Sequence, residues 1–310
     1  MNGSARWVLG LVAAISIVSL SAYGQQRPQI QVQTPETNGD EKVPIDSFEL
    51  ESGYVFESDL NHGGSHGAQD EVENSFSYSH RFQITGNWYL RGGLSYQRFD
   101  FGNTDAPVPV HLQSGAAIIS IDYMHGDDIG AMLEVRPGFY TEEHIGLSSF
   151  DCPITLMRFW VVRPKEFYVL TGVNYSFLRG GVGVAPVLGV VWVPTKQFRI
   201  MAVPTEPRAI YSLGKQLDLY VGAAFAGGSY RTDHHDSYKG IPHVEKLSGT
   251  QIDFSDYRVG GGIVWSPTDH IDVDLSAGCS IQRAFLYHRA GENFRTDPSP
   301  YLHLAVKASF

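Results

Sequence analysis

The sequence predicts an all-β chain that forms a transmembrane antiparallel up-and-down β-barrel. Three observations carry this prediction. Apolar and polar side chains alternate along long segments, short and long connections alternate, and no apolar run after residue 24 is long enough for a membrane helix. Composition agrees, because 33 glycines, 16 tyrosines and 17 phenylalanines among 310 residues suit strands and turns.

The first residues predict export. Arg6 precedes the apolar run WVLGLVAAISIVSLSA, and Ala22 and Gly24 stand three and one positions before a cleavage point at Gln25. We therefore expect a signal peptide at 1–24, the alternative being a membrane-anchoring helix. Residues 25–46 are rich in Gln, Pro and charge without an apolar period, which predicts a flexible periplasmic leader. The barrel is expected over 47–310.

Period-two alternation defines the strands. In VENSFSYSHRFQI, residues 72–84, Phe76, Tyr78, Phe82 and Ile84 share one face, and polar residues occupy the other. The same alternation recurs in 129–140, 217–231 and 270–282. Turn residues separate the strands at one end, and longer polar loops are expected near 59–71, 102–112, 141–153, 232–250 and 287–299.

A barrel in lipid faces its apolar side chains outward and keeps polar side chains in its interior. The alternation therefore predicts a set of charged, lumen-facing residues: Arg81, Arg91, Glu134, Arg136, Asp218, Asp272, Asp274 and Lys307. An exported soluble β-sandwich would show the same alternation. Strands of about 10 residues favour the barrel, because sandwich strands more often have about 5 or 6.

The aromatic residues predict two membrane-interface girdles. Trp88, Trp160, Trp192 and Trp265 each adjoin a short turn, as interfacial tryptophans do at strand ends. A second girdle is expected near the long loops, from Phe99, Phe101, Phe139, Tyr140, Tyr230, Phe285 and Tyr287.

The number of strands depends on residues 198–212. Pro204 and Pro207 are unfavourable in a central strand, and the segments on either side of them are short. Counted as a hairpin, this piece gives about 14 strands, and counted as an irregular excursion it gives about 12. The sequence-based preference is 12, with 14 as the alternative.

The chain ends in an alternating strand with an aromatic last residue. Leu302, Leu304, Val306, Ala308 and Phe310 share one face of this strand. This ending resembles the C-terminal assembly signal of bacterial outer-membrane β-barrel proteins, although the usual pattern has an aromatic residue where Ala308 stands. The resemblance implies an outer-membrane location, recognition by the barrel-assembly machinery and contact with outer-membrane lipids. It extends to uncharacterised barrel families and implies no substrate.

Several function classes receive little support from the residues. A formal net charge of -10 argues against a nucleic-acid partner. Cys152 and Cys279 are expected to be free thiols, and no cofactor is expected. His62 and His66 in one loop, with His234, His235 and Asp236 in another, are the candidates for a metal site or a hydrolytic rim.

These observations together predict a non-enzymatic barrel with a narrow or plugged lumen, passive and porin-like if it conducts small solutes. Glu134 and Arg136 illustrate the mixed charge that either a pore or an ion-paired, closed interior would have. The alternatives are a structural or anchoring protein without transport, a rim-located hydrolase or metal-binding barrel, and the soluble sandwich.

Overall fold

The alternating segments form β-strands in a computed structural model of the chain, which describes residues 45–125, 128–181, 183–234 and 247–310. The predicted signal peptide and residues 25–44 of the predicted leader lie outside the described residues. The seventeen strand segments and one short 3-10 helix are β1 (Asp46–Asn61), β2 (Ser65–Thr85), β3 (Trp88–Phe101), β4 (His111–His125), β5 (Asp128–Val135), β6 (Gly138–Thr141), η1 (Leu147–Ser149), β7 (Phe150–Asp151), β8 (Ile154–Arg163), β9 (Phe167–Tyr175), β10 (Val184–Trp192), β11 (Phe198–Ala202), β12 (Arg208–Ser212), β13 (Leu217–Arg231), β14 (Gln251–Thr268), β15 (Ile271–Tyr287), β16 (Glu292–Thr296) and β17 (Ser299–Ser309).

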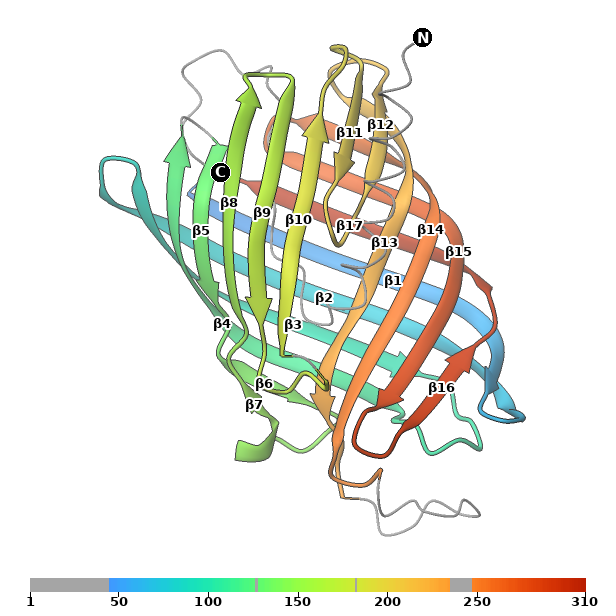
Figure 1. Ribbon diagram of the computed structural model, residues 1–310. Coiled ribbons are helices and arrows are strands. Elements are labelled where there is room, and N and C mark those ends of the chain that lie inside the picture. The colour runs from blue at the N-terminus through green and yellow to red at the C-terminus, as the bar shows by residue number, and fades with distance from the viewer. Residues whose placement is uncertain (1–44, 126–127, 182, 235–246) are drawn as a thin grey trace.

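The strands close into one antiparallel barrel of fourteen strands (Figure 1). Three positions in the wall are each built from two segments, β5 with β6, β7 with β8, and β16 with β17, which pair with the same neighbours. The last strand pairs with the first from Ser47 opposite Ser309 to Val55 opposite Tyr301. This closure leaves no free edge between the two ends of the chain.

Fourteen strands replace the preferred estimate of twelve, because residues 198–212 form a hairpin. β11 and β12 have five residues each and pair with one another. Pro204 and Pro207 lie in the connection between them, where no ladder hydrogen bond from a proline nitrogen is needed. The prolines thus shorten the two strands without removing them.

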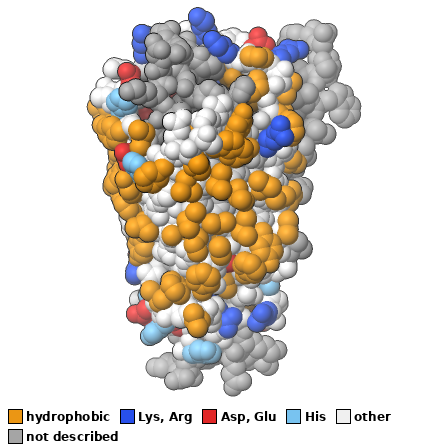
Figure 2. All heavy atoms as spheres, turned by 90° about the vertical axis from the view of Figure 1, so that its left-hand side faces the viewer, with side chains coloured by type: hydrophobic (Ala, Val, Ile, Leu, Met, Phe, Trp, Pro, Cys, Tyr) orange, Lys and Arg blue, Asp and Glu red, His pale blue; other side chains and the backbone are white. Residues whose placement is uncertain are grey.

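A belt of exposed apolar side chains surrounds the barrel. Figure 2 shows it on one face as a broad orange band, with charged side chains gathered toward the two ends. Leu94, Val221 and Leu275 are 62%, 64% and 56% exposed, while their inward-facing neighbours Gly93, Gly222 and Asp274 are small or polar. Within the described residues, no helix is long and apolar enough to cross a membrane. The exposed apolar faces have the placement expected of strands that contact lipid.

The two ends of the barrel differ. The first described residue, Ile45, the last residue, Phe310, and the short connections, such as that between β2 and β3, lie at one end, called here the turn end. The longer connections after β3, β6 and β13 lie at the other, the loop end (Figure 1). The expected loop at 59–71 is much shorter than predicted, because β1 extends to Asn61 and β2 begins at Ser65.

The first aromatic girdle is present and the second is not formed by the predicted residues. Trp88, Trp160, Trp192 and Trp265 are all more than 40% exposed near the turn end. At the loop end, six of the seven predicted girdle residues are buried instead: Phe99, Phe101, Tyr140, Tyr230, Phe285 and Tyr287. The prediction was wrong because proximity to a strand end does not determine which face of the strand a side chain occupies.

Candidate functional site in the barrel interior

The buried aromatic residues form a cluster inside the loop end of the barrel. Phe254 lies at its centre, with ring centroids 5.0 Å from Phe99, 4.9 Å from Phe101 and 5.0 Å from Phe285. Its other buried members come from β1, β4, β6, β13, β14, β15 and β16 and from connections between strands: Leu60, Ala106, Val108, Leu112, Ala116, Tyr140, Leu178, Ala226, Tyr230, Leu247, Ile252, Tyr287 and Phe294.

An ion-pair network lies in the interior on β2, β14 and β15. Arg258 is 2% exposed and bonds three carboxylates: those of Asp256, Glu71 at 3.0 Å and Glu73 at 2.7 Å. Arg283, fully buried, approaches Glu71 at 3.9 Å. Acid-base pairing of this kind is what allows charges to remain in a poorly solvated interior.

A second network lies on β2 to β5. Arg91 lies between two carboxylates, 3.0 Å from Asp122 and 2.9 Å from Glu134. Arg81 also pairs with Asp122, at 3.3 Å, and Arg136 also pairs with Glu134, at 2.6 Å. All five side chains are less than 8% exposed. The alternation on these strands puts them on the face opposite the lipid-exposed side chains.

The remaining predicted lumen residues have partners nearer the turn end or along β15. Asp218 bonds Arg199 at 2.6 Å, and Lys307 bonds Glu49 at 2.5 Å. Asp274 bonds Arg208 at 2.7 Å and accepts from Tyr220. Asp272, which is exposed, accepts a hydrogen bond from Ser266.

Sequence reasoning did not single out Glu71, Glu73, Asp122, Asp256 or Arg258, which carry much of the two networks. Their signal was present, since each occupies the polar face of an alternating strand. What the sequence lacks is the register between strands, which brings Arg258 to Glu71, 187 positions away.

An apolar cluster fills the interior beside β8, β9 and β10. Met124, Met132, Met157, Leu170, Val187, Val191, Val203 and Phe225 are its buried members, and Met201 packs against them. The chain has five methionines, so every methionine except the initiator belongs to or touches this cluster, called here the methionine cluster. Met side chains are flexible and adapt to irregular space.

The methionine cluster borders an incomplete part of the wall. On β10, only Val190–Trp192 pair with β11, and on β13, only Asp218–Gly222 pair with β12. Beyond this hairpin, Val184–Gly189 of β10 pair with β9 but with no described strand on the side that faces β13 (Figure 1). The end of β13 pairs in parallel with β6, Arg231 opposite Thr141. We call this stretch between β10 and β13 the seam.

Phe225 shows how the seam is filled. It shares the face of the lipid-exposed Leu219 and Val221 on β13, yet it is only 3% exposed. Its ring packs among inward-facing side chains of β8, β9 and β10 in the methionine cluster. The loop-end half of β13 therefore lies on the inner side of those strands. The Phe225 backbone N–H donates to the carbonyl of Thr205, and beyond this hydrogen bond side chains close the seam.

The histidines predicted as metal ligands are engaged elsewhere. His62 bonds Glu292 through Nε2 at 2.9 Å and the carbonyl of Asn293 through Nδ1 at 3.1 Å, and His66 bonds the carbonyl of His62. His234 is exposed, and His235 and Asp236 lie outside the described residues. The described members of the predicted set are therefore not assembled around one point.

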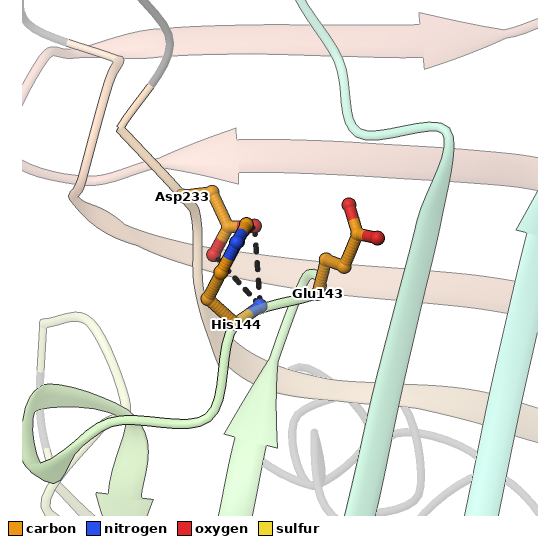
Figure 3. Close-up of side chains that lie close together, drawn as sticks. All are labelled: Glu143, His144 and Asp233. Carbon is orange, nitrogen blue, oxygen red and sulfur yellow. Dashed lines mark hydrogen bonds and ion pairs between the residues drawn. The ribbon is translucent and has the colours of Figure 1, made fainter.

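A different set of potential ligands meets at the loop-end rim. Glu143, His144 and Asp233 place ligand atoms within 4.8 Å of one another (Figure 3). His144 Nδ1 lies 2.8 Å from Asp233 Oδ2, and the His144 backbone N–H donates to the same carboxylate. The hydrogen bond with Asp233 and its negative charge raise the pKa of His144 above its usual value. The His144–Asp233 contact is thus a structural link between the loop after β6 and the end of β13.

Ser79 and His80 illustrate why strand neighbours do not form a catalytic pair. Ser79 is 1% exposed in the interior, whereas His80 faces outward and bonds Asp46 at 2.9 Å. Adjacent residues of a strand point to opposite faces.

The closed strand order, the exposed apolar belt and the buried polar interior together decide the class. The chain forms a closed β-barrel with an apolar outer surface and a polar interior. No family model and no curated protein matches it.

Three solved structures illustrate what this barrel is similar to. An outer-membrane channel from Pseudomonas putida F1 has 10% identity and a TM-score of 0.43, covering 90% of this chain and 100% of that one. The toluene transporter TodX from Pseudomonas putida has 9% identity and a TM-score of 0.45, with 95% and 96% covered. The translocator domain of the autotransporter NalP from Neisseria meningitidis has 8% identity and a TM-score of 0.37, with 99% and 97% covered.

Proposed function

We propose that the protein is exported to the bacterial outer membrane and acts there as a passive channel for small solutes, closed in the conformation described. The turn end would face the periplasm and the loop end the exterior, as in other barrels of this type. Glu143, His144 and Asp233 would then lie at the outer rim.

One observation carries the proposal: the interior retains charged networks instead of a continuous apolar filling. A barrel of about 8 strands is just filled by its own side chains, and wider barrels leave room for a ligand or a channel. A purely structural barrel of fourteen strands gains nothing from keeping Arg258 and Arg91 in its interior, because buried ion pairs are poor stabilisers compared with apolar packing. Passage of polar solutes explains why charged side chains are kept in the interior.

In this proposal the cluster of buried aromatic residues around Phe254 closes the lumen, and we call it the aromatic plug. We expect the wild-type protein in planar bilayers to conduct weakly or not at all. The double variant Phe254→Ala, Phe285→Ala removes two touching rings from the plug and should raise single-channel conductance several-fold. Phe76→Ala with Phe82→Ala, on the lipid side of β2, is the matched control and should leave conductance unchanged.

Failure of this experiment would be informative. If both the wild type and the plug variant insert as heat-modifiable barrels and neither conducts, the channel proposal is refuted and the structural or anchoring role is favoured.

A second candidate function, transit of small apolar molecules, is favoured by the seam. The methionine cluster connects the seam, at Phe225 and Val203, with Tyr89, Phe159, Tyr168 and Val193. An apolar molecule could pass along such a surface without entering the charged networks. Phe225→Ala should then raise uptake of the apolar dye N-phenylnaphthylamine by intact cells, whereas Val221→Ala on the same strand should not. Equal uptake in both variants would remove this candidate.

A further inference from the structure

The connection between β9 and β10 reaches across the seam at the loop end (Figure 1). β9 and β10 lie on one side of the seam, and β13, followed by β14 and β15, lies on the other. Residues 176–181, the part of this connection called here the strap, contact Asp253 on β14 and His288, the residue after β15. The strap therefore joins two parts of the wall that, among the described strands, are not paired with one another.

Asp151 on β7 fixes the base of the strap. Its carboxylate, which is buried, accepts from the Ser176 hydroxyl at 2.6 Å and from the backbone N–H groups of Phe177 and Leu178 at 3.0 Å and 3.4 Å. Leu178 is also buried and belongs to the aromatic plug. Three donors on one carboxylate define the direction in which the strap leaves β9.

The tip of the strap lies against Asp253 and His288. The Gly180 backbone N–H donates to Asp253 Oδ1 at 3.5 Å, and His288 Nε2 lies 2.8 Å from Asp253 Oδ2. A Cβ atom added at position 180 would overlap the His288 ring, so only glycine allows this approach. We call these contacts of Gly180, Asp253 and His288 the latch.

Ser229 shows which surface lies beside the latch. It is directly opposite Asp253 in the pairing of β13 with β14, and therefore on the same face. On β13 it shares that face with Leu219 and Val221, which are 38% and 64% exposed, yet Ser229 is 0% exposed. Its hydroxyl has no hydrogen-bond partner among the described residues. The face that contacts lipid near the turn end is thus covered at the loop end, where the latch holds the strap.

The seam is closed differently at its two ends. Toward the turn end, β11 and β12 fill the gap, with backbone pairing to β10 on one side and to β13 on the other. Toward the loop end, the Gly180 N–H and the His288 ring both bond the carboxylate of Asp253. Contacts to one carboxylate can break without unpairing a strand, and segments held by few such bonds are the ones that open locally. The loop end is therefore the end at which the seam can open.

We propose that the latch holds the strap over the seam, and that release of the latch opens the seam at the loop end and uncovers the face of β13 around Ser229. Asp151 keeps the base in place, so the strap moves about that base. The proposal names the element that controls the second candidate function, transit of small apolar molecules. It rests on that function for passage of a molecule but not for the latch.

Gly180→Ala tests the latch, because the added methyl group displaces either the strap or the His288 ring, and either change breaks it. Hydrogen exchange of the purified full-length barrel in lipid vesicles, followed by mass spectrometry, should become at least about 10-fold faster in residues 176–181 and in residues 223–231 of β13. Gly146→Ala, in the connection after β6, is the matched control. A Cβ atom there would lie 3.9 Å from its nearest neighbour, and neither segment should change.

Removing the ring shows whether the effect acts through the latch. In a His288→Ala background the methyl group at position 180 has room, so Gly180→Ala should then accelerate exchange by less than about 2-fold. An equal effect of Gly180→Ala with and without the ring would overturn the proposal. Unchanged exchange in Gly180→Ala would overturn it too. Acceleration confined to residues 176–181 would show that the strap does not hold the seam closed, and would also overturn it.

Dye uptake separates this proposal from the transit function. Uptake of N-phenylnaphthylamine by cells carrying Gly180→Ala should rise several-fold if apolar molecules pass along the seam. Faster exchange of both segments without raised uptake would overturn the transit function and support the latch, because exchange is measured without any solute. The two failures are therefore distinguishable.

Discussion

Arg258 on β14 donates from Nη1 to Oε2 of Glu73 on β2 at 2.7 Å, across 185 positions of sequence. Both side chains are 2% exposed or less. The contact joins two strands that are not neighbours in the wall, so it spans the interior.

Removing this arginine is expected to destabilise the barrel strongly. Arg258→Gln removes the cation that bonds three buried carboxylates, and breaking a buried pair on one side costs about 3–5 kcal/mol. Urea titration in lipid vesicles, followed by tryptophan fluorescence, should show this loss in the free energy of unfolding. Arg163→Gln is the control, because its pair with Glu166 is 3.9 Å long and exposed, and it should change stability by less than about 0.5 kcal/mol. Equal effects of both substitutions would show that the network is solvated.

The same contact shows how far the sequence could predict the interior. Period-two alternation was sufficient to place Arg81, Arg91, Glu134 and Arg136 on polar faces, because the face of a residue follows from its own strand. The partners could not be predicted, since they depend on register and tilt across the barrel. Glu73 and Arg258 are adjacent only after fourteen strands have closed.

Residues 198–212 and the loop-end aromatics limit the prediction for different reasons. Pro204 and Pro207 indicate that a strand is interrupted between residues 198 and 212. The sequence does not show whether the prolines lie in the turn of a hairpin or in an irregular segment without strands. Phe99 and Phe285 look like interfacial residues by position, yet they point inward and pack on one another through Phe101 and Phe254. Counting residues from a turn does not show where the inward side chains of a strand change from aromatic, near the loop end, to polar.

The contact between His144 and Asp233 predicts that the stability of the loop-end rim depends on pH. Because the hydrogen bond with Asp233 raises the pKa of His144 in the folded state above its ordinary value of 6.5, the charged pair stabilises the rim fully below about pH 6.5. That contribution is lost as the pH rises through the folded-state pKa. Hydrogen exchange of residues 142–146 should be slower at pH 6 than in Asp233→Asn at the same pH, and the two proteins should converge at pH 8.5. A difference that persists at pH 8.5 would assign the protection to the backbone contact of His144 instead.

The four turn-end tryptophans predict a defined depth in the membrane. Trp88, Trp160, Trp192 and Trp265 are exposed near one end of the apolar belt, where indole rings favour the interface. Lipids brominated close to the headgroup should therefore quench tryptophan fluorescence more strongly than lipids brominated near the chain ends. Phe82→Trp, at another outward position near the β2–β3 turn, should add fluorescence with the same quenching pattern. Stronger quenching by chain-end bromines would place these residues at mid-membrane and contradict the assigned belt.

We expect substitution of Phe310 to affect assembly of the barrel more than its stability. Phe310 is 62% exposed, its backbone N–H donates to the carbonyl of Asp46, and its ring lies 5.7 Å from that of His270. Truncating an exposed side chain removes little packing, so Phe310→Ala should change the free energy of unfolding by no more than about 1 kcal/mol. If the terminal strand is read by the assembly machinery, the same variant should nevertheless reduce the heat-modifiable barrel in outer-membrane fractions several-fold.

Ser309→Ala, the neighbouring position on the opposite face, is the control for this comparison and should assemble normally. Ala308→Phe supplies the aromatic residue that the usual terminal pattern has at this position, and it should raise the assembled fraction if that pattern is what the machinery recognises. A Phe310→Ala protein that refolds normally in lipid vesicles and assembles normally in cells would separate the terminal aromatic from recognition. The alternating Leu302, Leu304 and Val306 would then act only as the lipid face of the strand that closes the barrel on β1.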